Sequence, residues 1–299
     1  MPAASMSCAR RSLGRGRVHH IGRREHLPVQ IRGVGRCDGD SKCLWRYCAH
    51  VGMPALRLAQ TYLPFLRPLK FGAYNMGTRL FGWRVDPEFH LLSRVGPISE
   101  AIDIGGNWGQ SICALQRAVS PRRIVSFEPN AVLAQRLKRR YESGDVQVHA
   151  CGLSDADGTF DLFIPRYRNF VYDGLASLDE NEARGWLNPE TMARFDESKL
   201  TIERHPVQVR RLDDFGLDPQ AIKIDVQGME AAVIRGGLAT ITASRPVMIV
   251  ETPSDEVVSL LQQAELKPYA YRDGRLSHGW RDAENTVFLT DSHRDRAGL

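Results

Sequence analysis

Residues 97–109 decide the fold, and they read Pro97-Ile98-Ser99-Glu100-Ala101-Ile102-Asp103-Ile104-Gly105-Gly106-Asn107-Trp108-Gly109. This short apolar run ends in an acid and then breaks into glycines. Ala101, Ile102 and Ile104 suit a strand that is buried on both faces. Helical spacing of apolar residues follows in residues 111–119. The stretch therefore predicts a strand, a glycine-rich turn and a helix.

The glycine-rich turn indicates a ligand site. Glycines let a backbone approach a ligand closely, and free N–H groups at a helix start attract anionic groups. Such a turn can hold a dinucleotide pyrophosphate or the amino-acid end of S-adenosylmethionine. The spacing Gly-Gly-x-x-Gly departs from the dinucleotide pattern, and the Asp103 carboxylate would repel a diphosphate but pair with an ammonium. We therefore favour S-adenosylmethionine.

A second acid ends the next expected strand, which covers residues 123–128. Glu128 lies about 20 residues beyond the glycine turn, where a ribose diol needs a hydrogen-bond acceptor. Taken singly, an acid such as Asp103 or Glu128 is more often an ordinary carboxylate at a strand end than a ligand-binding group. Together with the glycines, they predict a cofactor site.

Later segments repeat the alternation of strand and helix. We expect strands at 146–151, 221–226 and 247–251, helices at 88–95, 131–143, 231–243 and 254–266, and closing strands at 267–271 and 286–290. The pair Gly236-Gly237 is a weak point in the third of these helices. This order predicts an α/β fold with a doubly wound, mostly parallel sheet.

We divide the chain into a basic leader (1–52), an N-terminal helical segment (53–96) and a main domain (97–291) with an insertion (156–206). Residues 159–164 alternate like a strand, and residues 207–212 are expected to form another. Between them, residues 166–205 have no clear period, many charges and scattered aromatic residues. Long insertions beside cofactor sites commonly form a lid or a substrate pocket. We interpret this one in the same way, and a partly ordered surface loop is the alternative.

The leader carries the basic charge of the chain. Residues 1–52 hold 10 Lys and Arg against 3 Asp and Glu, so the other residues carry about −2 of the formal net charge of +5. A nucleic-acid partner is therefore not expected, because the basic pI does not belong to the folded body. We interpret the leader as disordered, and as an untranslated extension upstream of Met53 or Met76. A transit-like presequence and a polyanion-binding arm are the alternatives.

The cysteine pattern and the hydropathy predict a cytoplasmic protein with no membrane span. The six cysteines form neither a disulfide framework nor a paired zinc motif, and no secretory apolar segment is evident. A membrane-spanning helix needs about 20 consecutive apolar residues. The sequence contains no run of even 18.

With these elements in place, the chain resembles the FkbM-type methyltransferases, a family of S-adenosylmethionine-dependent O-methyltransferases. The resemblance covers roughly residues 86–290. The matching text is Asp103-Ile104-Gly105-Gly106-Asn107-Trp108-Gly109, Phe127-Glu128-Pro129-Asn130, Gly152-Leu153-Ser154-Asp155, Leu212-Asp213-Asp214, Lys223-Ile224-Asp225-Val226-Gln227-Gly228-Met229-Glu230 and Val250-Glu251.

The resemblance implies a seven-stranded class I methyltransferase (Rossmann-like) sheet, with the last strand antiparallel. It also implies a set of cofactor-binding residues: Asp103, Gly105, Gly106, Asn107, Gly109, Glu128, Ser154 and Asp155. Two residues depart from the family. Gly106 replaces the usual alanine, which should be harmless, and Gln227 replaces the usual glutamate, which could slow the reaction or change the acceptor.

Acids at two further strand ends are the candidates for chemistry. The strands that end near Asp225 and Glu251 should be neighbours, and Lys223 shares a strand face with Asp225. Asp225 is our first choice for a general base or acceptor-positioning group, and Lys223 and Glu251 follow it. These carboxylates could hold Mg²⁺, but only two acids are well placed, so we do not favour a metal.

The expected acceptor is a hydroxyl group of a sugar, a glycan or a small metabolite, as the family implies. Methyltransferases that act on the amino groups of bases typically carry an Asn/Asp-Pro-Pro-aromatic turn. Here the corresponding residues read Asp225-Val226-Gln227-Gly228, so this turn is absent. The alternatives are a nicotinamide-dependent oxidoreductase and a non-catalytic Rossmann-like binding module. The sequence leaves the oligomeric state open.

Overall fold

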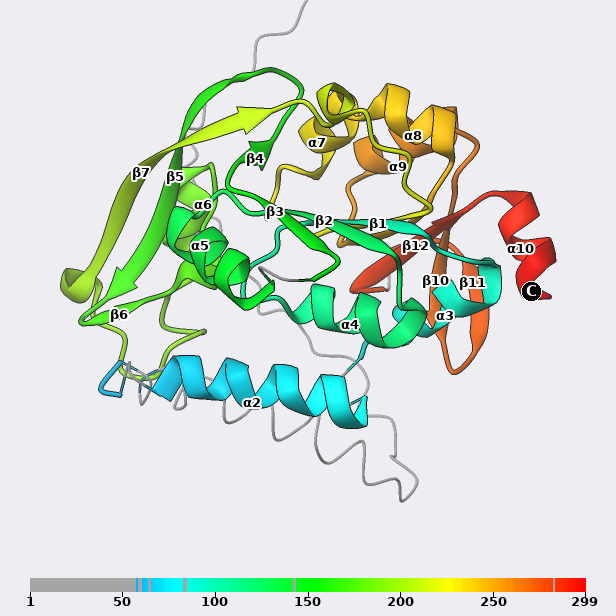
Figure 1. Cartoon of the computed structure of the whole chain (residues 1–299). Helices are drawn as coiled ribbons and strands as arrows, with labels where there is room; N and C mark the ends of the chain where they lie inside the picture. The colour runs from blue at the N-terminus through cyan, green and yellow to red at the C-terminus, as the bar shows by residue number, and fades with distance from the viewer. Residues whose placement is uncertain (1–57, 59–60, 64–65, 83–84, 142–143, 282) are drawn as a thin grey trace, which may run out of the picture. The chain divides into compact units, whose positions relative to one another are not determined.

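A computed structural model describes residues 58, 61–63, 66–82, 85–141, 144–281 and 283–299 (Figure 1). The leader 1–52 lies outside the described residues. All described residues belong to one unit, residues 48–299. This unit contains an eight-stranded sheet in the order β11-β10-β12-β9-β8-β1-β2-β3 and a four-stranded sheet in the order β4-β7-β5-β6.

Five strands of the large sheet are parallel to one another, as the alternation of strand and helix predicts. They are β1 (Glu100–Ile104), β2 (Arg123–Phe127), β3 (Val146–His149), β8 (Ala221–Ile224) and β9 (Val247–Glu251). β12 (Asn285–Leu289) runs antiparallel to β9 and to β10 (Lys267–Arg272). The expectation of seven strands omitted β11 (Arg275–His278), an edge strand with no buried residue and therefore no apolar alternation.

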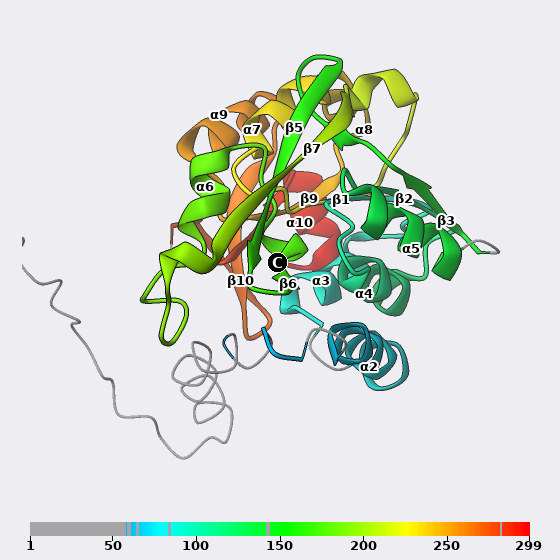
Figure 2. The same ribbon diagram turned by 90° about the vertical axis from the view of Figure 1, so that its left-hand side faces the viewer.

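Helices cover both faces of this sheet (Figures 1 and 2). One face holds α3 (Pro87–Val95), α4 (Gln110–Val119), α5 (Ala131–Tyr141) and α10 (Asp291–Ala297). The other face holds α7 (Glu230–Gly236), α8 (Leu238–Ser244) and α9 (Asp255–Gln263). Outside α4 lies α2 (Leu66–Phe81). Across the described ranges, none of these helices is both long and apolar enough to cross a bilayer.

The break between α7 and α8 occurs at the glycine pair identified in the sequence. α7 ends at Gly236, and α8 begins at Leu238. A Cβ atom on Gly236 would lie 1.9 Å from the carbonyl oxygen of Ser154, so this helix end needs glycine to approach the neighbouring backbone.

The insertion forms most of the smaller sheet. β5 (Gly158–Tyr167) and β7 (Leu200–Arg210) pair antiparallel along their length, flanked by β4 (Gly152–Leu153) and β6 (Phe170–Val171). The strand expected at 159–164 lies within β5, and the one expected at 207–212 overlaps the end of β7. The connection from β6 to β7 contains η1 (Asp173–Leu175), α6 (Glu180–Gly185) and η2 (Glu197–Lys199). Ion pairs between β5 and β7, Arg166 with Glu203 and Arg204 with Asp161, supply part of this pairing. Such contacts leave no apolar period in residues 200–206, so the first part of β7 was not expected.

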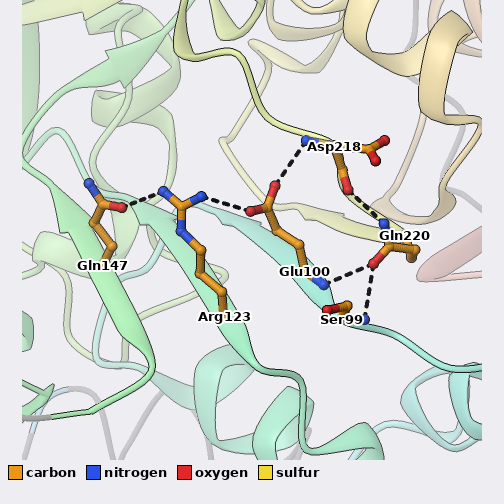
Figure 3. Close-up of polar contacts among 6 residues, drawn as sticks. All are labelled: Ser99, Glu100, Arg123, Gln147, Asp218 and Gln220. Atoms are coloured by element: carbon orange, nitrogen blue, oxygen red, sulfur yellow. Dashed lines mark hydrogen bonds and ion pairs between the residues drawn. The ribbon is translucent and has the colours of Figure 1, made fainter.

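A polar network joins four strands of the large sheet at their amino ends (Figure 3). The Arg123 guanidinium donates to Glu100 Oε2 at 2.8 Å and to Gln147 Oε1 at 2.6 Å. The Gln220 Oε1 atom accepts from the backbone N–H groups of Ser99 and Glu100 at 3.0 and 2.9 Å. The network therefore supports the register of β1, β2, β3 and β8 at the edge opposite their carboxyl ends.

We expect Gly236→Ala to lower the free energy of unfolding by about 1–3 kcal/mol, because its methyl group must displace the Ser154 backbone. Gly185→Ala is the matched control, since Gly185 also ends a short helix but a Cβ atom there would have no other atom within 4 Å. The control should change stability by less than about 1 kcal/mol. Urea unfolding of both variants tests this, and equal losses would contradict it.

Candidate functional site

A cavity of about 690 Å³, counted with its open mouth, lies at the carboxyl ends of β1, β2 and β8. Strand order reverses beside β1, where ligands bind in open α/β sheets. Four predicted site residues line the cavity: Gly105, Asn107, Glu128 and Asp225. The insertion supplies another part of the wall through Leu162 and residues 173, 174 and 176–178.

The glycine turn packs closely against the chain at the carboxyl ends of β2 and β8. Gly105 has φ +93°, and a Cβ atom there would lie 1.9 Å from the Asp225 carbonyl oxygen. The N–H groups of Gly105 and Gly106 both donate to the Phe127 carbonyl, at 2.9 and 3.1 Å. The Asn107 N–H donates to Glu128 Oε2 at 2.7 Å. These three N–H groups of the turn are therefore already used within the chain, whereas the donors expected for a ligand are those at the start of α4, which begins at Gln110.

Asp103 is fully buried between two polar neighbours. Its register partners are Ser126 on β2 and Lys223 on β8. The Ser126 hydroxyl donates to Asp103 Oδ2 at 2.8 Å, whereas no described residue donates to Oδ1. Burial raises the pKa of Asp103, and the nearby hydroxyls of Ser111 and Ser126 oppose this shift. Asp103 itself is not among the residues that line the cavity, but it keeps one carboxylate oxygen for a further partner.

Glu128 is also buried, and backbone donors hold it in place. Its Oε2 accepts from Asn107 N–H, and its Oε1 accepts from Asn130 N–H, each at 2.7 Å. Burial raises the pKa of Glu128 to about 7, although these hydrogen bonds favour the carboxylate. Each oxygen retains a second lone pair that can accept from a ligand.

Gly106 and Gly109 lie beneath the turn rather than among the residues that line the cavity. A Cβ atom on Gly106 would lie 2.5 Å from Ser126 Oγ and 2.9 Å from Leu137 Cδ1. A Cβ atom on Gly109 would lie 3.0 Å from Leu137 Cδ2. Glycine at position 106 thus fits this chain's own Ser126, the hydroxyl that holds Asp103.

Asp225, Lys223 and Glu251 come together at the ends of β8 and β9. Glu251 hydrogen-bonds Asp225, and this contact together with burial raises the pKa of Glu251 to about 8. Lys223 is buried and donates to Asn285 Oδ1 at 2.9 Å. The Gln227 side-chain amide donates to Asp225 Oδ1 at 3.2 Å. Asp225 is thus the member of this group that lines the cavity.

Ser154 and Asp155 contact α7 instead of lining the cavity. The Ser154 hydroxyl donates to Asp155 Oδ1 at 3.3 Å, and Asp155 Oδ2 accepts from Arg235 Nε at 2.9 Å. Asp155 is exposed. These two residues therefore stay apart from the other predicted cofactor residues.

The insertion closes over the loop that follows β8. Ser177, which lines the cavity, donates to Glu182 of α6 and to the Gln227 carbonyl, the latter at 3.5 Å. The Glu182 carboxylate lies 3.1 Å from the Cβ position of Gly228. Across the cavity, Trp108 Nε1 donates to Asp173 Oδ1 at 3.4 Å.

Sequence reasoning missed several residues of this site. Asp173 and Ser177 lie in the insertion, which was expected to form a pocket but has no motif that singles them out. Asn285 holds Lys223 from β12, more than 60 residues away in sequence, and no local signal marks it. Within the described ranges, no three His, Cys, Asp or Glu side chains are grouped so that they could hold a metal ion.

The strand order and the acids at the strand ends define a class I methyltransferase fold with its ligand site at the reversal of strand order. The chain belongs to the FkbM methyltransferase family, since the family model of the methyltransferase FkbM domain matches residues 103–267.

Three similar proteins illustrate the range of relatives. The AMB antimetabolite synthetase AmbE of Pseudomonas aeruginosa is 31% identical over 166 residues, which are 47% of this chain but only 8% of AmbE. The crystal structure of methyltransferase FkbM from Methylobacillus flagellatus has 15% identity and a TM-score of 0.40, over 64% of this chain and 43% of that one. An O-methyltransferase from Bacillus cereus has 13% identity and a TM-score of 0.34, over 74% and 88%.

We expect Gly106→Ala to destabilise the protein by about 1–3 kcal/mol, because the methyl group meets Ser126 and Leu137. In a Ser126→Ala background, the same change should cost less, since the atom 2.5 Å from the new methyl group is gone. Urea unfolding of the two single variants and the double variant gives the coupling free energy. Strictly additive losses would show that Ser126 does not restrict position 106.

Proposed function

We propose that this chain is an S-adenosylmethionine-dependent O-methyltransferase that acts on a hydroxyl group of a sugar, a glycan or a small metabolite. The observation that carries the proposal is the cavity at the reversal of strand order, lined by Gly105, Asn107 and Glu128. Two residues before Gly105, the buried Asp103 carboxylate keeps an Oδ1 atom with no described donor. Buried charges need a partner, and an ammonium group can donate to this oxygen.

The residues around the cavity fit the other parts of the cofactor. Glu128 retains acceptor capacity for a ribose diol, and Asn107 Oδ1 is a second buried atom without a described partner. Asp103, Gly105, Asn107 and Glu128 would hold the cofactor. Gly106 and Gly109 would act by allowing close packing beneath it. The contacts of Ser154 and Asp155 with α7 support a role for these two in positioning that helix.

The same geometry disfavours a dinucleotide cofactor. A pyrophosphate needs free backbone donors at the glycine turn. The N–H groups of Gly105, Gly106 and Asn107 already donate to Phe127 and Glu128, and two buried carboxylates would repel its negative charge.

The Asp225–Glu251 pair suits proton removal from a hydroxyl acceptor. When bound, S-adenosylmethionine supplies a methyl group on a sulfonium. The contact with Asp225 and burial raise the pKa of Glu251 to about 8, so Glu251 would donate at neutral pH to the Asp225 carboxylate beside the cavity and hold it in place. Asp225 accepts the acceptor's proton as the oxygen gains the methyl group. Lys223, fixed by Asn285, supplies a positive charge that balances these acids.

The acceptor class rests on the family and on the wall of the cavity. Polar groups from the insertion, Asp173 and Ser177, line the cavity together with Asp225 and Gln227, which suits a hydroxylated acceptor. AmbE is named as an antimetabolite synthetase, which favours a small metabolite. The side-chain amide of Gln227 donates a hydrogen bond to Asp225. A glutamate at position 227, as is usual in the family, would instead place a second carboxylate beside Asp225.

Calorimetric titration with S-adenosylhomocysteine and, separately, with NAD distinguishes the leading function from the oxidoreductase. We expect binding of S-adenosylhomocysteine and none of NAD. The reverse result would reject the proposal. A non-catalytic module would bind S-adenosylhomocysteine but show no methyl transfer to any acceptor in a screen of hydroxylated sugars and small metabolites.

The affinity for S-adenosylhomocysteine should rise as the pH increases through about 7. Burial raises the pKa of Glu128 to about 7, so Glu128 is protonated below this pH and loses acceptor capacity for the ribose hydroxyls. Calorimetry from pH 6 to 8 measures the effect. Glu128→Gln should bind more weakly and lose the pH dependence, and a variant that keeps the wild-type dependence would contradict the assignment.

Asp225→Asn should reduce kcat by about 10²- to 10⁴-fold, the usual contribution of a general base. The affinity for S-adenosylhomocysteine should stay unchanged, and Asp214→Asn, at an exposed acid that does not line the cavity, is the control. Glu251 loses its proton above its pKa of about 8 and can then no longer donate to Asp225, so wild-type kcat should fall as the pH rises through 8. Glu251→Gln should abolish that transition. Unchanged methyl transfer in Asp225→Asn would refute its role.

A further inference from the structure

Helix α2 carries an exposed apolar face. Leu69, Met76 and Leu80 are 69%, 54% and 61% exposed, and their spacing of seven and four residues places them on one side of a helix. The opposite side is buried, since Asn75 and Thr78 have almost no exposed surface and α2 packs on α4. Six of the eight exposed large apolar residues in the described part of the chain lie between Tyr62 and Phe81.

The helices on this side of the sheet are basic. The sequences of α2, α4 and α5 contain no Asp or Glu. Their cations are Arg67, Lys70, Arg79, Arg117, Arg136, Lys138, Arg139 and Arg140. Along the chain, no acid occurs between Asp40 and Asp86. Arg79 and Arg117 line one groove between α2 and α4, which also includes Asp145.

We propose that this apolar face, defined by Leu69, Met76 and Leu80 with the flanking cations Lys70 and Arg79, docks on the surface of an anionic lipid bilayer. A helix with exposed apolar residues and basic flanks binds in the interface by burying its apolar side and attracting anionic headgroups. This mode needs no membrane-spanning helix.

Charge complementarity favours a bilayer over two other occupants. A second copy of the chain would bring two basic, acid-free faces together. The leader is itself basic, with 10 Lys and Arg against 3 Asp and Glu in residues 1–52, so like charges would oppose its docking on α2. An anionic headgroup layer pairs with the cations and covers the apolar residues at once.

The other side of α2 contacts the ligand site. The Phe71 ring stacks on Trp108 of the glycine turn, with centroids 4.7 Å apart. Asn75 Nδ2 donates to the Trp108 carbonyl oxygen at 2.8 Å, and Trp108 reaches Asp173 of the cavity wall. Both views show α2 outside α4 on the side of the sheet away from α7–α9 (Figures 1 and 2). Docking through α2 would therefore hold the cavity close to the bilayer surface.

Vesicle co-sedimentation of the full chain tests this inference independently of the proposed reaction. The probes are vesicles of phosphatidylcholine alone and of phosphatidylcholine with phosphatidylglycerol. The variant Leu69→Gln/Met76→Gln/Leu80→Gln removes the apolar face without changing the charge. Val132→Gln is the matched control, because Val132 is 67% exposed on the basic helix α5. Thermal melts establish that each variant is folded.

We expect binding to the anionic vesicles, and at least a tenfold rise in the lipid concentration for half-binding in the triple variant. The control should stay within twofold of wild type. Because the basic leader can attract lipid by itself, hydrogen–deuterium exchange locates the contact, and vesicles should protect residues 66–81.

Three outcomes would overturn the inference. The first is the absence of binding, and the second is binding without protection of residues 66–81. The third is a dimer, seen by light scattering, that dissociates in the triple variant and binds no vesicles. That result would assign the face to a second copy of the chain.

Discussion

The site depends on the burial of a carboxylate in the middle of a sheet. Asp103 has no solvent contact, so its charge is tolerable only with partners close by. Ser126 and Lys223 stand on either side of it in the strand register. The parallel arrangement creates this constraint, because it brings side chains from three strands into one row at the edge where strand order reverses.

The cavity divides into two chemically different halves. Toward β1 and β2, backbone donors and fixed acceptors define the surroundings of Asn107 and Glu128. Toward β8 and β9, Asp225 and Glu251 lie close together, and this contact together with burial raises the pKa of Glu251. The insertion spans both halves, since Asp173 contacts Trp108 and Ser177 contacts Gln227. One added segment thus helps to shape both parts of the site.

Local patterns predicted the elements around the site well, because βα units carry their own periodicity. The helix expected after the glycine turn matches α4, and the weak point at Gly236-Gly237 is the break between α7 and α8. The insertion could not be predicted in detail, since β5 and β7 pair through ions as well as apolar residues. Likewise, the Lys223–Asn285 contact depends on strand order rather than on neighbouring sequence.

The network at the amino ends of the strands has a consequence for how the chain folds. Strands β1, β2 and β3 follow one another as short βα units, whereas the Gln220 contact with Glu100 closes a loop of 120 residues. Long loops cost more chain entropy to close than short ones, and non-local pairing slows folding. We therefore expect the first three strands to assemble early, with β8 joining β1 late and bringing Asp225 to the carboxyl-end edge of the sheet.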